Sequence, residues 1–125
     1  MNVVDSSAWL SYLAGDNNAA EFAAAIENLE KLLVPSITLT EVFKSIMCQR
    51  DEGAAMQVVA HMQQGKVVPL DSALAIDAAV FGLKYKLPLG DSIIYATASK
   101  FSAVVWTQDA DFKALPDVQY FPVVN

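Results

Sequence analysis

The stretch Asn2-Val3-Val4-Asp5-Ser6-Ser7-Ala8-Trp9 at the start of the chain combines the signals that decide the fold. Its two adjacent valines predict a short buried strand, and Asp5 ends that strand. Residues 6–14 then carry apolar side chains at helical spacing, and Gly15 closes the predicted helix. A short apolar strand that passes directly into a helix is typical of a parallel sheet, because parallel strands need a crossover connection between them.

The same alternation of short apolar runs and helical segments continues along the rest of the chain. Further strands are predicted at residues 32–34, 66–70, 103–106 and 120–121. Further helices are predicted at residues 19–29, 38–52, 54–64, 72–86 and 91–101. This order predicts an α/β fold, a three-layer α/β/α sandwich around a short parallel sheet of four to five strands. Pro69 favours an edge position for the third strand, because proline cannot donate to a neighbouring strand.

Composition limits the classes of protein that this chain can belong to. With 125 residues, 54% hydrophobic and 18% charged, we expect a single domain over residues 1–125 with a substantial buried core. The excess of apolar residues suggests that a partner chain covers one face. The net charge of −6 argues against a basic protein that binds nucleic acid through positive charge alone. A single cysteine, Cys48, and a single histidine, His61, exclude disulfide frameworks, zinc ribbons and histidine-rich metal sites.

Nothing in the sequence indicates a membrane segment or a signal peptide. No uncharged apolar run approaches 18 residues, and an acid interrupts the N-terminal apolar stretch after only four residues. We therefore expect a cytoplasmic protein with no membrane association.

Four acids are placed where the predicted sheet would bind a ligand. Asp5 and Asp109 follow predicted strands, and Glu41 and Asp91 lie near the starts of predicted helices. In parallel α/β sheets, ligands bind beyond the carboxyl ends of the strands. Each acid also has a purely structural interpretation. Asp5, Asp91 and Asp109 can cap the segments that follow them, and Glu41 can form a capping box with Thr38.

If the four acids converge, their chemistry points to a hard divalent cation. Two unit charges about 4 Å apart repel by about 4 kcal/mol at an effective dielectric constant of about 20. Mg²⁺ and Mn²⁺ prefer oxygen ligands. Since the chain has one histidine and one cysteine, a site made of oxygen ligands is the only kind of metal site that it can form well. The spacing of the acids along the sequence does not itself establish that they converge.

Four short motifs occur in a fixed order along the chain. They are Val3-Val4-Asp5-Ser6-Ser7-Ala8-Trp9-Leu10, Leu39-Thr40-Glu41-Val42, Leu87-Pro88-Leu89-Gly90-Asp91-Ser92-Ile93-Ile94-Tyr95-Ala96 and Trp106-Thr107-Gln108-Asp109-Ala110-Asp111-Phe112. Each motif alone is weak, but together, at these separations, they resemble those of PIN-domain ribonucleases. The resemblance covers essentially the whole chain and is greatest to the VapC-type toxins of prokaryotic toxin–antitoxin systems.

The resemblance implies a metal site with assigned residues. It implies that four acids bind Mg²⁺ or Mn²⁺ and act in catalysis: Asp5, Glu41, Asp91 and Asp109. Asp111 is an alternative or additional ligand beside Asp109, and the sequence does not choose between the two. Ser6 and Thr107 are expected to orient carboxylates through their hydroxyl groups.

The resemblance also implies an activity and partners. The activity is metal-dependent hydrolysis of RNA phosphodiester bonds by an endoribonuclease, the toxin of a toxin–antitoxin pair. A cognate antitoxin is expected to place an arginine or lysine against Asp5 or Asp91. A homodimer is expected as well, through the helix at residues 54–64 with its apolar Met56, Val59 and Met62.

Two alternative functions remain open from the sequence. A receiver-type signalling domain has a similar length and acids at strand ends, although Ser6 follows Asp5 where a second acid would be expected. A catalytically inactive PIN-like scaffold that only binds a partner would keep the fold, but the four intact acids argue against it.

Overall fold

The computed structural model describes residues 1–124 and alternates single strands with pairs of helices. The strands are β1 (Asn2–Val4), β2 (Leu32–Pro35), β3 (Lys66–Val68), β4 (Val104–Thr107) and β5 (Val118–Tyr120). The helices are α1 (Ser6–Ala14), α2 (Ala19–Glu27), α3 (Ser36–Gln49), α4 (Glu52–Met62), α5 (Ser72–Tyr85) and α6 (Leu89–Lys100). Two short 3₁₀ turns, η1 (Leu29–Lys31) and η2 (Ala110–Phe112), precede β2 and follow β4.

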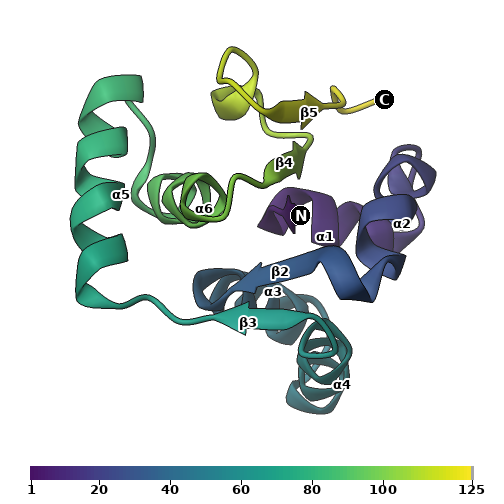
Figure 1. Cartoon of the computed structure of the whole chain (residues 1–125). Helices are drawn as coiled ribbons and strands as arrows, with labels where there is room; N and C mark the ends of the chain where they lie inside the picture. Colours follow the sequence, from purple (N-terminus) through teal and green to yellow (C-terminus); the bar gives the residue numbers. More distant parts are fainter. Residues whose placement is uncertain (125) are drawn as a thin grey trace.

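The five strands form one parallel sheet in the order β3-β2-β1-β4-β5 (Figure 1). The chain therefore starts in the middle of the sheet, where Val3 lies between Leu33 of β2 and Val105 of β4. The predicted α/β/α fold with a short parallel sheet is confirmed, and β3 is at an edge as predicted, although it ends at Val68 and Pro69 lies outside the strand.

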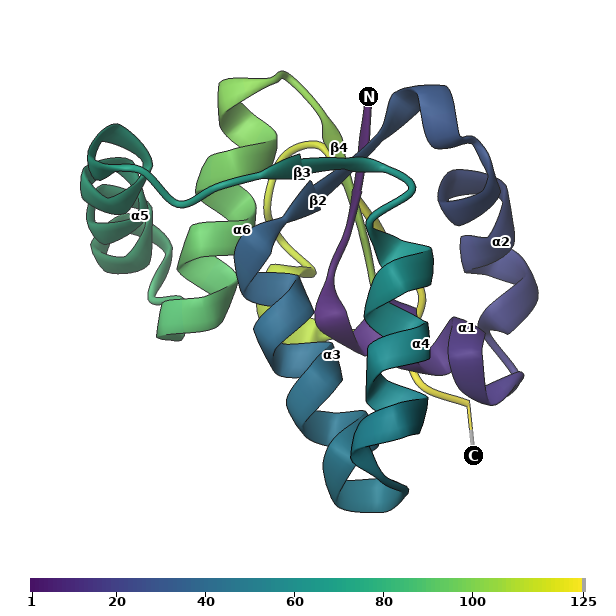
Figure 2. The same cartoon turned by 90° about the horizontal axis from the view of Figure 1, so that it is seen from below.

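Helices cover both faces of the sheet because the strand side chains alternate between two cores. Val3 belongs to a core shared with α5 and α6, whereas Val4 belongs to a core shared with α1, α2, α3 and α4. Figures 1 and 2 show α5 and α6 on one side of the sheet and α1 and α2 on the other. This arrangement leaves the carboxyl ends of the strands, where α1, α3 and α6 begin, as the edge available to a ligand.

Helices α3, α4 and α6 each begin two residues before the predicted start, and two of the capping interpretations, at α3 and α6, are wrong. Thr38 lies inside the first turn of α3 and its hydroxyl donates to the carbonyl of Pro35 at 2.7 Å, so it makes no capping box with Glu41. Asp91 lies in the first turn of α6 and does not cap it, because the carbonyl of Pro88 already accepts from the Ser92 amide at 2.9 Å. Helices α3 and α6 both start directly after a proline, which is the N-cap residue of each helix.

The dimer surface predicted on α4 is incomplete in the structure. Met62 is fully buried in the core with α1 and α2, and Met56 is 55% exposed. Periodicity alone does not show which apolar residues of an amphipathic helix face inward. Within residues 1–124, no helix combines the length and apolar character needed to cross a membrane.

Candidate metal centre

The pairing of β1 with β4 brings the first and last motifs of the sequence together. Val4 pairs with Trp106, and the amide of Asp5 donates to the Trp106 carbonyl at 3.1 Å. Asp5 and Thr107 therefore lie side by side at the carboxyl edge of the sheet, although about a hundred residues separate them along the chain.

Asp5 is a helix cap and also a buried carboxylate at this edge. Its Oδ1 accepts from the amide of Ala8 at 3.0 Å, as predicted for a cap of α1. The hydroxyl of Ser7 donates to Oδ1 at 2.8 Å, and the hydroxyl of Thr107 donates to Oδ2 at 2.9 Å. Asp5 is only 2% exposed, so these donors replace water around a carboxylate that solvent hardly reaches.

Thr107 also fixes the position of the next acid along the chain. Its hydroxyl oxygen accepts from the Asp109 amide at 2.8 Å while the same hydroxyl donates to Asp5. Asp109 caps the turn η2 through a bond from the Asp111 amide to its Oδ1 at 2.9 Å, as predicted from sequence. One hydroxyl thus couples the ends of β1 and β4, and the turn that follows directs Asp111 back toward Asp109.

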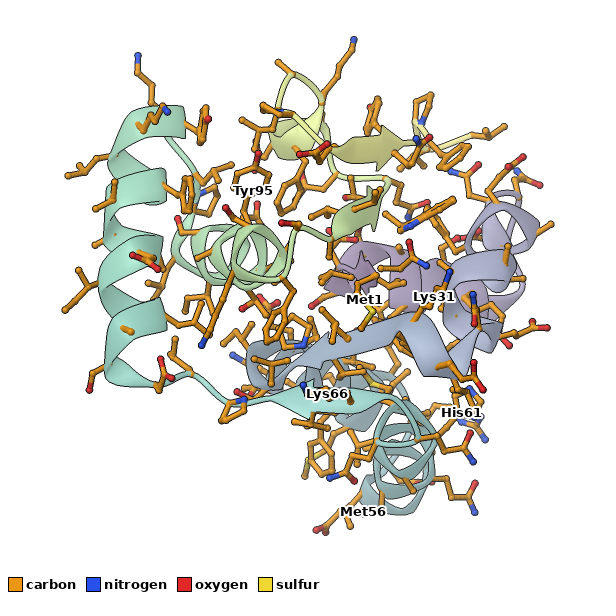
Figure 3. The ribbon with its side chains drawn as sticks, in the orientation of Figure 1. Met1, Lys31, Met56, His61, Lys66 and Tyr95 are labelled. Atoms are coloured by element: carbon orange, nitrogen blue, oxygen red, sulfur yellow. The ribbon has the colours of Figure 1, made fainter. Side chains whose placement is uncertain are left out.

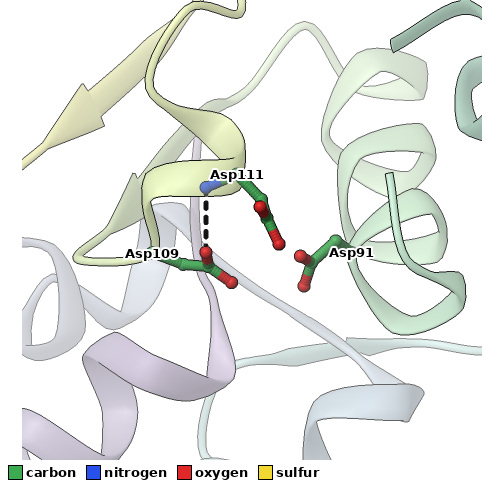
Figure 4. A group of neighbouring side chains, drawn as sticks. All are labelled: Asp91, Asp109 and Asp111. Carbon is green, nitrogen blue, oxygen red and sulfur yellow. Dashed lines mark hydrogen bonds between the residues drawn. The ribbon is translucent and has the colours of Figure 1, made fainter. Parts of the chain in front are cut away.

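The start of α6 completes a group of three carboxylates. One oxygen from each of Asp91, Asp109 and Asp111 lies within 4.8 Å of the others (Figure 4). Asp91 is half-buried, and Asp111 is exposed. The structure therefore brings both candidate acids of the last motif beside Asp91. Asp5 and Glu41 are not among these three carboxylates.

Glu41 reaches the same edge from α3. The hydroxyl of Ser6 donates to Glu41 Oε1 at 2.6 Å, which ties the start of α1 to α3. Gly90 lies against the other carboxylate oxygen, since a Cβ added to Gly90 would be 2.6 Å from Glu41 Oε2. The absence of a side chain at Gly90 therefore lets Glu41 approach the start of α6, one residue from Asp91.

Mutual repulsion and burial change the acid–base behaviour of the site. Burial raises the pKa of Asp5 from 3.8 to about 6, against the lowering effect of its hydrogen bonds. Burial and the nearby carboxylates of Asp109, Asp5 and Asp111 raise the pKa of Asp91 from 3.8 to about 8. Both shifts have the sign expected for carboxyl groups that lack a counter-ion.

No basic side chain compensates this charge in the part of the chain that the structure describes. The single ion pair among residues 1–124 joins Lys100 to Asp71, 3.9 Å apart, at the start of α5. His61, the only histidine, is exposed on α4 with its ring 6.5 Å from that of Tyr12 (Figure 3). A set of close, uncompensated carboxylate oxygens is the donor set that suits a hard divalent cation.

Two contributors to the site do not stand out in the sequence. Ser7 donates to Asp5, and Gly90 makes room for Glu41. The signals available for them were the second serine after Asp5 and the glycine directly before Asp91. Neither residue could be assigned to the site from the sequence, because its contact depends on how the helices pack together.

Comparison with solved structures shows what this fold is similar to. A toxin–antitoxin complex from Klebsiella pneumoniae contains a chain with 20% identity and a TM-score of 0.78, covering 98% of this chain and 100% of that one. VapC20 from Mycobacterium tuberculosis, a toxin that cleaves the sarcin–ricin loop, has 19% identity and a TM-score of 0.79, with the same coverage. DNA-bound VapBC from Salmonella typhimurium has 17% identity and a TM-score of 0.73, covering 97% and 96%.

Sequence comparison identifies the family. No curated protein sequence is similar enough to this chain to count as a match. A sequence model of the PIN domain, in contrast, matches residues 3–118, which include all four motifs and every acid of the site. The chain therefore belongs to the PIN domain family.

Proposed function

We propose that this protein is a metal-dependent endoribonuclease that hydrolyses RNA phosphodiester bonds and is the toxin of a toxin–antitoxin pair. The observation that carries the proposal is the group formed by Asp91, Asp109 and Asp111, whose oxygens lie within 4.8 Å of one another. In residues 1–124 no basic side chain forms an ion pair with them. The nuclease activity of the PIN domain family supports the same conclusion.

The proposed cation is Mg²⁺ or Mn²⁺, held by Asp91, Asp109 and Asp111, with Asp5 and Glu41 adding negative charge around it. A divalent ion bound there would supply a water of lowered pKa and would neutralise charge on the phosphate. Thr107 supports the site at two points, because its hydroxyl donates to the Asp5 carboxylate and accepts from the backbone amide of Asp109. Ser6 fixes Glu41 in the same way, through a 2.6 Å hydrogen bond. Such hydroxyl contacts preserve the orientation of the carboxylates.

Protons and the cation compete for the same oxygens in this proposal. Burial and the neighbouring carboxylates raise the pKa of Asp91 to about 8, which favours proton binding at this group of acids in the metal-free protein. That proton reduces the repulsion among the grouped carboxylates, and it leaves Asp91 when the cation binds. The protein can therefore hold a dense carboxylate site in its folded state before any metal arrives.

The proposed binding site of the antitoxin is a cleft whose lining contains none of the acids of the site. A cleft of about 620 Å³ runs between α1 and the α3–α4 pair, with Leu10, Leu13, Ile46 and Val58 in its walls. Gln108, which precedes Asp109, lines the same cleft. In this proposal, a basic side chain of the antitoxin pairs with the acids that follow Gln108 in the chain. Several solved structures with this fold are toxin–antitoxin complexes, which supports the assignment of an antitoxin as the partner.

The proposed toxin is a cytoplasmic homodimer. Three of its exposed large apolar residues, Ile76, Val80 and Leu83, belong to one helix, α5. The receiver-type alternative is disfavoured by topology. Receiver domains such as CheY use the strand order 2-1-3-4-5, whereas this sheet has the order β3-β2-β1-β4-β5.

An assay of RNA cleavage with matched variants tests the proposed activity. We expect the purified protein to cut RNA with Mg²⁺ or Mn²⁺ and to lose this activity in excess EDTA. Asp91→Asn removes one charge from the site and should abolish cleavage. Asp71→Asn removes one charge from the start of α5, outside the site, and should leave cleavage unchanged.

Each unexpected outcome has a definite meaning. Full activity in excess EDTA would contradict the metal mechanism. Wild-type activity of Asp91→Asn would contradict the assignment of the site. A protein that binds Mn²⁺ but cuts no RNA would support the alternative of an inactive PIN-like scaffold.

A further inference from the structure

Gln108 lies between two residues of the site, and the metal chemistry does not use its side chain. It follows Thr107 and precedes Asp109 in the chain. Its backbone amide donates to Ser7 Oγ at 3.4 Å, which connects it to the start of α1. Its side chain is half-buried and lines the cleft between α1 and the α3–α4 pair. Gln108 is therefore the residue of the last motif that connects the acids to the cleft.

Asn18 determines which way the side-chain amide of Gln108 faces. Asn18 is the N-cap residue of α2, but it is only 6% exposed and its side chain makes no capping hydrogen bond. Its Nδ2 donates instead to Gln108 Oε1 at 3.1 Å, to the Phe121 carbonyl at 3.4 Å and to the Pro122 carbonyl at 2.9 Å. Backbone carbonyls only accept, so Asn18 must turn its nitrogen toward them. Gln108 therefore has to turn its oxygen toward Asn18.

This orientation leaves Gln108 Nε2 as a donor beside the acids. An amide nitrogen donates hydrogen bonds and accepts none, and Oε1 is already paired with Asn18. Adjacent Cα atoms are about 3.8 Å apart, so a group bound to Gln108 lies close to any group bound to Asp109. The structure thus places one neutral donor directly next to the group of carboxylates.

The chemistry of this donor favours RNA over the antitoxin as its partner. A basic side chain from the antitoxin only donates, so it cannot pair with Nε2. RNA presents phosphate and base oxygens, which accept. A neutral donor also attracts such an oxygen without adding to the negative charge of the site.

We propose that Gln108 binds the substrate, with Nε2 donating to an oxygen of the RNA next to the phosphodiester bond that is cut. Asn18 is a positioning residue, because it holds the Gln108 amide in the donating orientation. This inference rests on the proposed function, since it names a contact to the proposed substrate. A contact made equally to the substrate and to the transition state changes KM and leaves kcat nearly unchanged.

Steady-state cleavage of a short RNA with Mn²⁺ tests the contact. Gln108→Glu keeps an oxygen for Asn18 but has no donor for the RNA. We expect KM to rise at least about 10-fold and kcat to change less than about threefold, because a hydrogen bond to a charged oxygen is lost. Gln64→Glu makes the same chemical change just before β3, at the opposite edge of the sheet, and should change neither constant.

Gln108→Ala separates the lost donor from the added charge. It should raise KM about 10-fold and leave the affinity for Mn²⁺ within about twofold of wild type, because the proposed contact is to RNA and not to the cation. A weaker affinity for Mn²⁺ together with a lower kcat would mean that Gln108 acts through the metal site, and would overturn the proposal.

A change at Asn18 tests the orientation of the amide. Asn18→Asp cannot donate to Gln108 Oε1, so the Gln108 amide should turn and present its oxygen to the RNA. We expect KM to rise about as much as in Gln108→Ala, although Gln108 itself is unchanged. Circular dichroism reports whether this variant folds, since its carboxylate faces the carbonyls of Phe121 and Pro122. If it does not fold, the two Gln108 variants decide the proposal.

Binding of RNA distinguishes a failure of this inference from a failure of the proposed function. If the wild type cuts RNA and Gln108→Glu keeps the wild-type KM, the contact is refuted and the nuclease stands. If the wild type cuts no RNA, the proposed function fails, and fluorescence anisotropy with a labelled RNA decides the contact. A lower RNA affinity of Gln108→Ala would then support it. An affinity equal to that of wild type, or no binding by either protein, would overturn it.

Discussion

The aspartates that precede α1 and α5 make the same local contact in opposite surroundings. Asp5 accepts from the Ala8 amide at 3.0 Å, and Asp71 accepts from the Leu74 amide at 2.9 Å. Asp71 is exposed and has Lys100 3.9 Å away, whereas Asp5 is buried without a cation. The same cap is therefore an ordinary surface feature at α5 and part of a charged site at α1. Asp5 and Asp71 differ in the residues that the fold places beside them.

The largest difference between the two caps should appear in catalysis. Asp5→Asn keeps a side chain that caps helices well but removes the charge, so we expect cleavage of RNA to fall at least about 100-fold. Asp71→Asn makes the same chemical change away from the site and should cut RNA at the wild-type rate. Initial rates with Mn²⁺ check both variants. Equal losses in the two variants would mean that the cap, and not the charge, is what matters.

The close contact of Gly90 with Glu41 allows a test that removes no charge. Gly90→Ala adds a Cβ that would lie 2.6 Å from Glu41 Oε2, so Glu41 must move away from the start of α6. We expect cleavage to fall about 10-fold, within the range seen when the residues that support metal ligands are changed. Gly53→Ala in α4 is the control, since its Cβ meets only Asp51 Oδ1 at 3.4 Å. Equal activity of the two variants would show that the position of Glu41 does not affect RNA cleavage.

The cap at α5 should matter for stability alone. Asp71→Ala removes the acceptor for the Leu74 amide, and we expect the free energy of unfolding to fall by about 0.5–2 kcal/mol. The loss should be the same with EDTA and with Mn²⁺, because Asp71 is outside the metal site. Chemical denaturation under both conditions measures it. A loss that depends on Mn²⁺ would place a cation at α5 instead.

The pH dependence of stability should show the smallest effect, with a definite sign. A carboxyl group whose pKa is higher in the folded than in the unfolded chain stabilises the fold at low pH, and that stability is lost as pH rises. The pKa values of about 8 for Asp91 and about 6 for Asp5 place this loss between pH 4 and pH 8. After solvent screening we expect about 1 kcal/mol from Asp91 in EDTA. Asp91→Asn should flatten the profile, and an unchanged profile would contradict the raised pKa.

The parts of the fold that depend on local pattern could be predicted from the sequence. The alternation of apolar strands with helices was sufficient to predict the parallel sheet. The caps by Asp5 and Asp109 followed from residue type and position. The helix starts at Ser36 and Leu89 could not be predicted from residue type and position. In both cases the N-cap is a proline that lies less than one turn before the residue that resembles a cap.

The parts that depend on packing could not be predicted in the same way. The neighbouring helices decide which apolar residues of α4 face inward, so Met62 was a misleading sequence signal for a dimer surface. The closeness of Asp91, Asp109 and Asp111 needs the 3₁₀ turn η2 and the start of α6 to meet. From the sequence alone, the prediction that these acids converge rested on resemblance to a family and not on periodicity.

Thermal unfolding with and without Mn²⁺ tests the carboxylate site most directly. If Asp91 belongs to a repelling group that binds a cation, Asp91→Asn should melt higher than wild type in EDTA, by about 1 kcal/mol in unfolding free energy. Mn²⁺ should then raise the Tm of wild type and of Asp71→Asn, and leave Asp91→Asn nearly unchanged. If Asp91→Asn melts lower than wild type in EDTA and Mn²⁺ shifts all three proteins equally, Asp91 has only a structural role and the metal site is refuted.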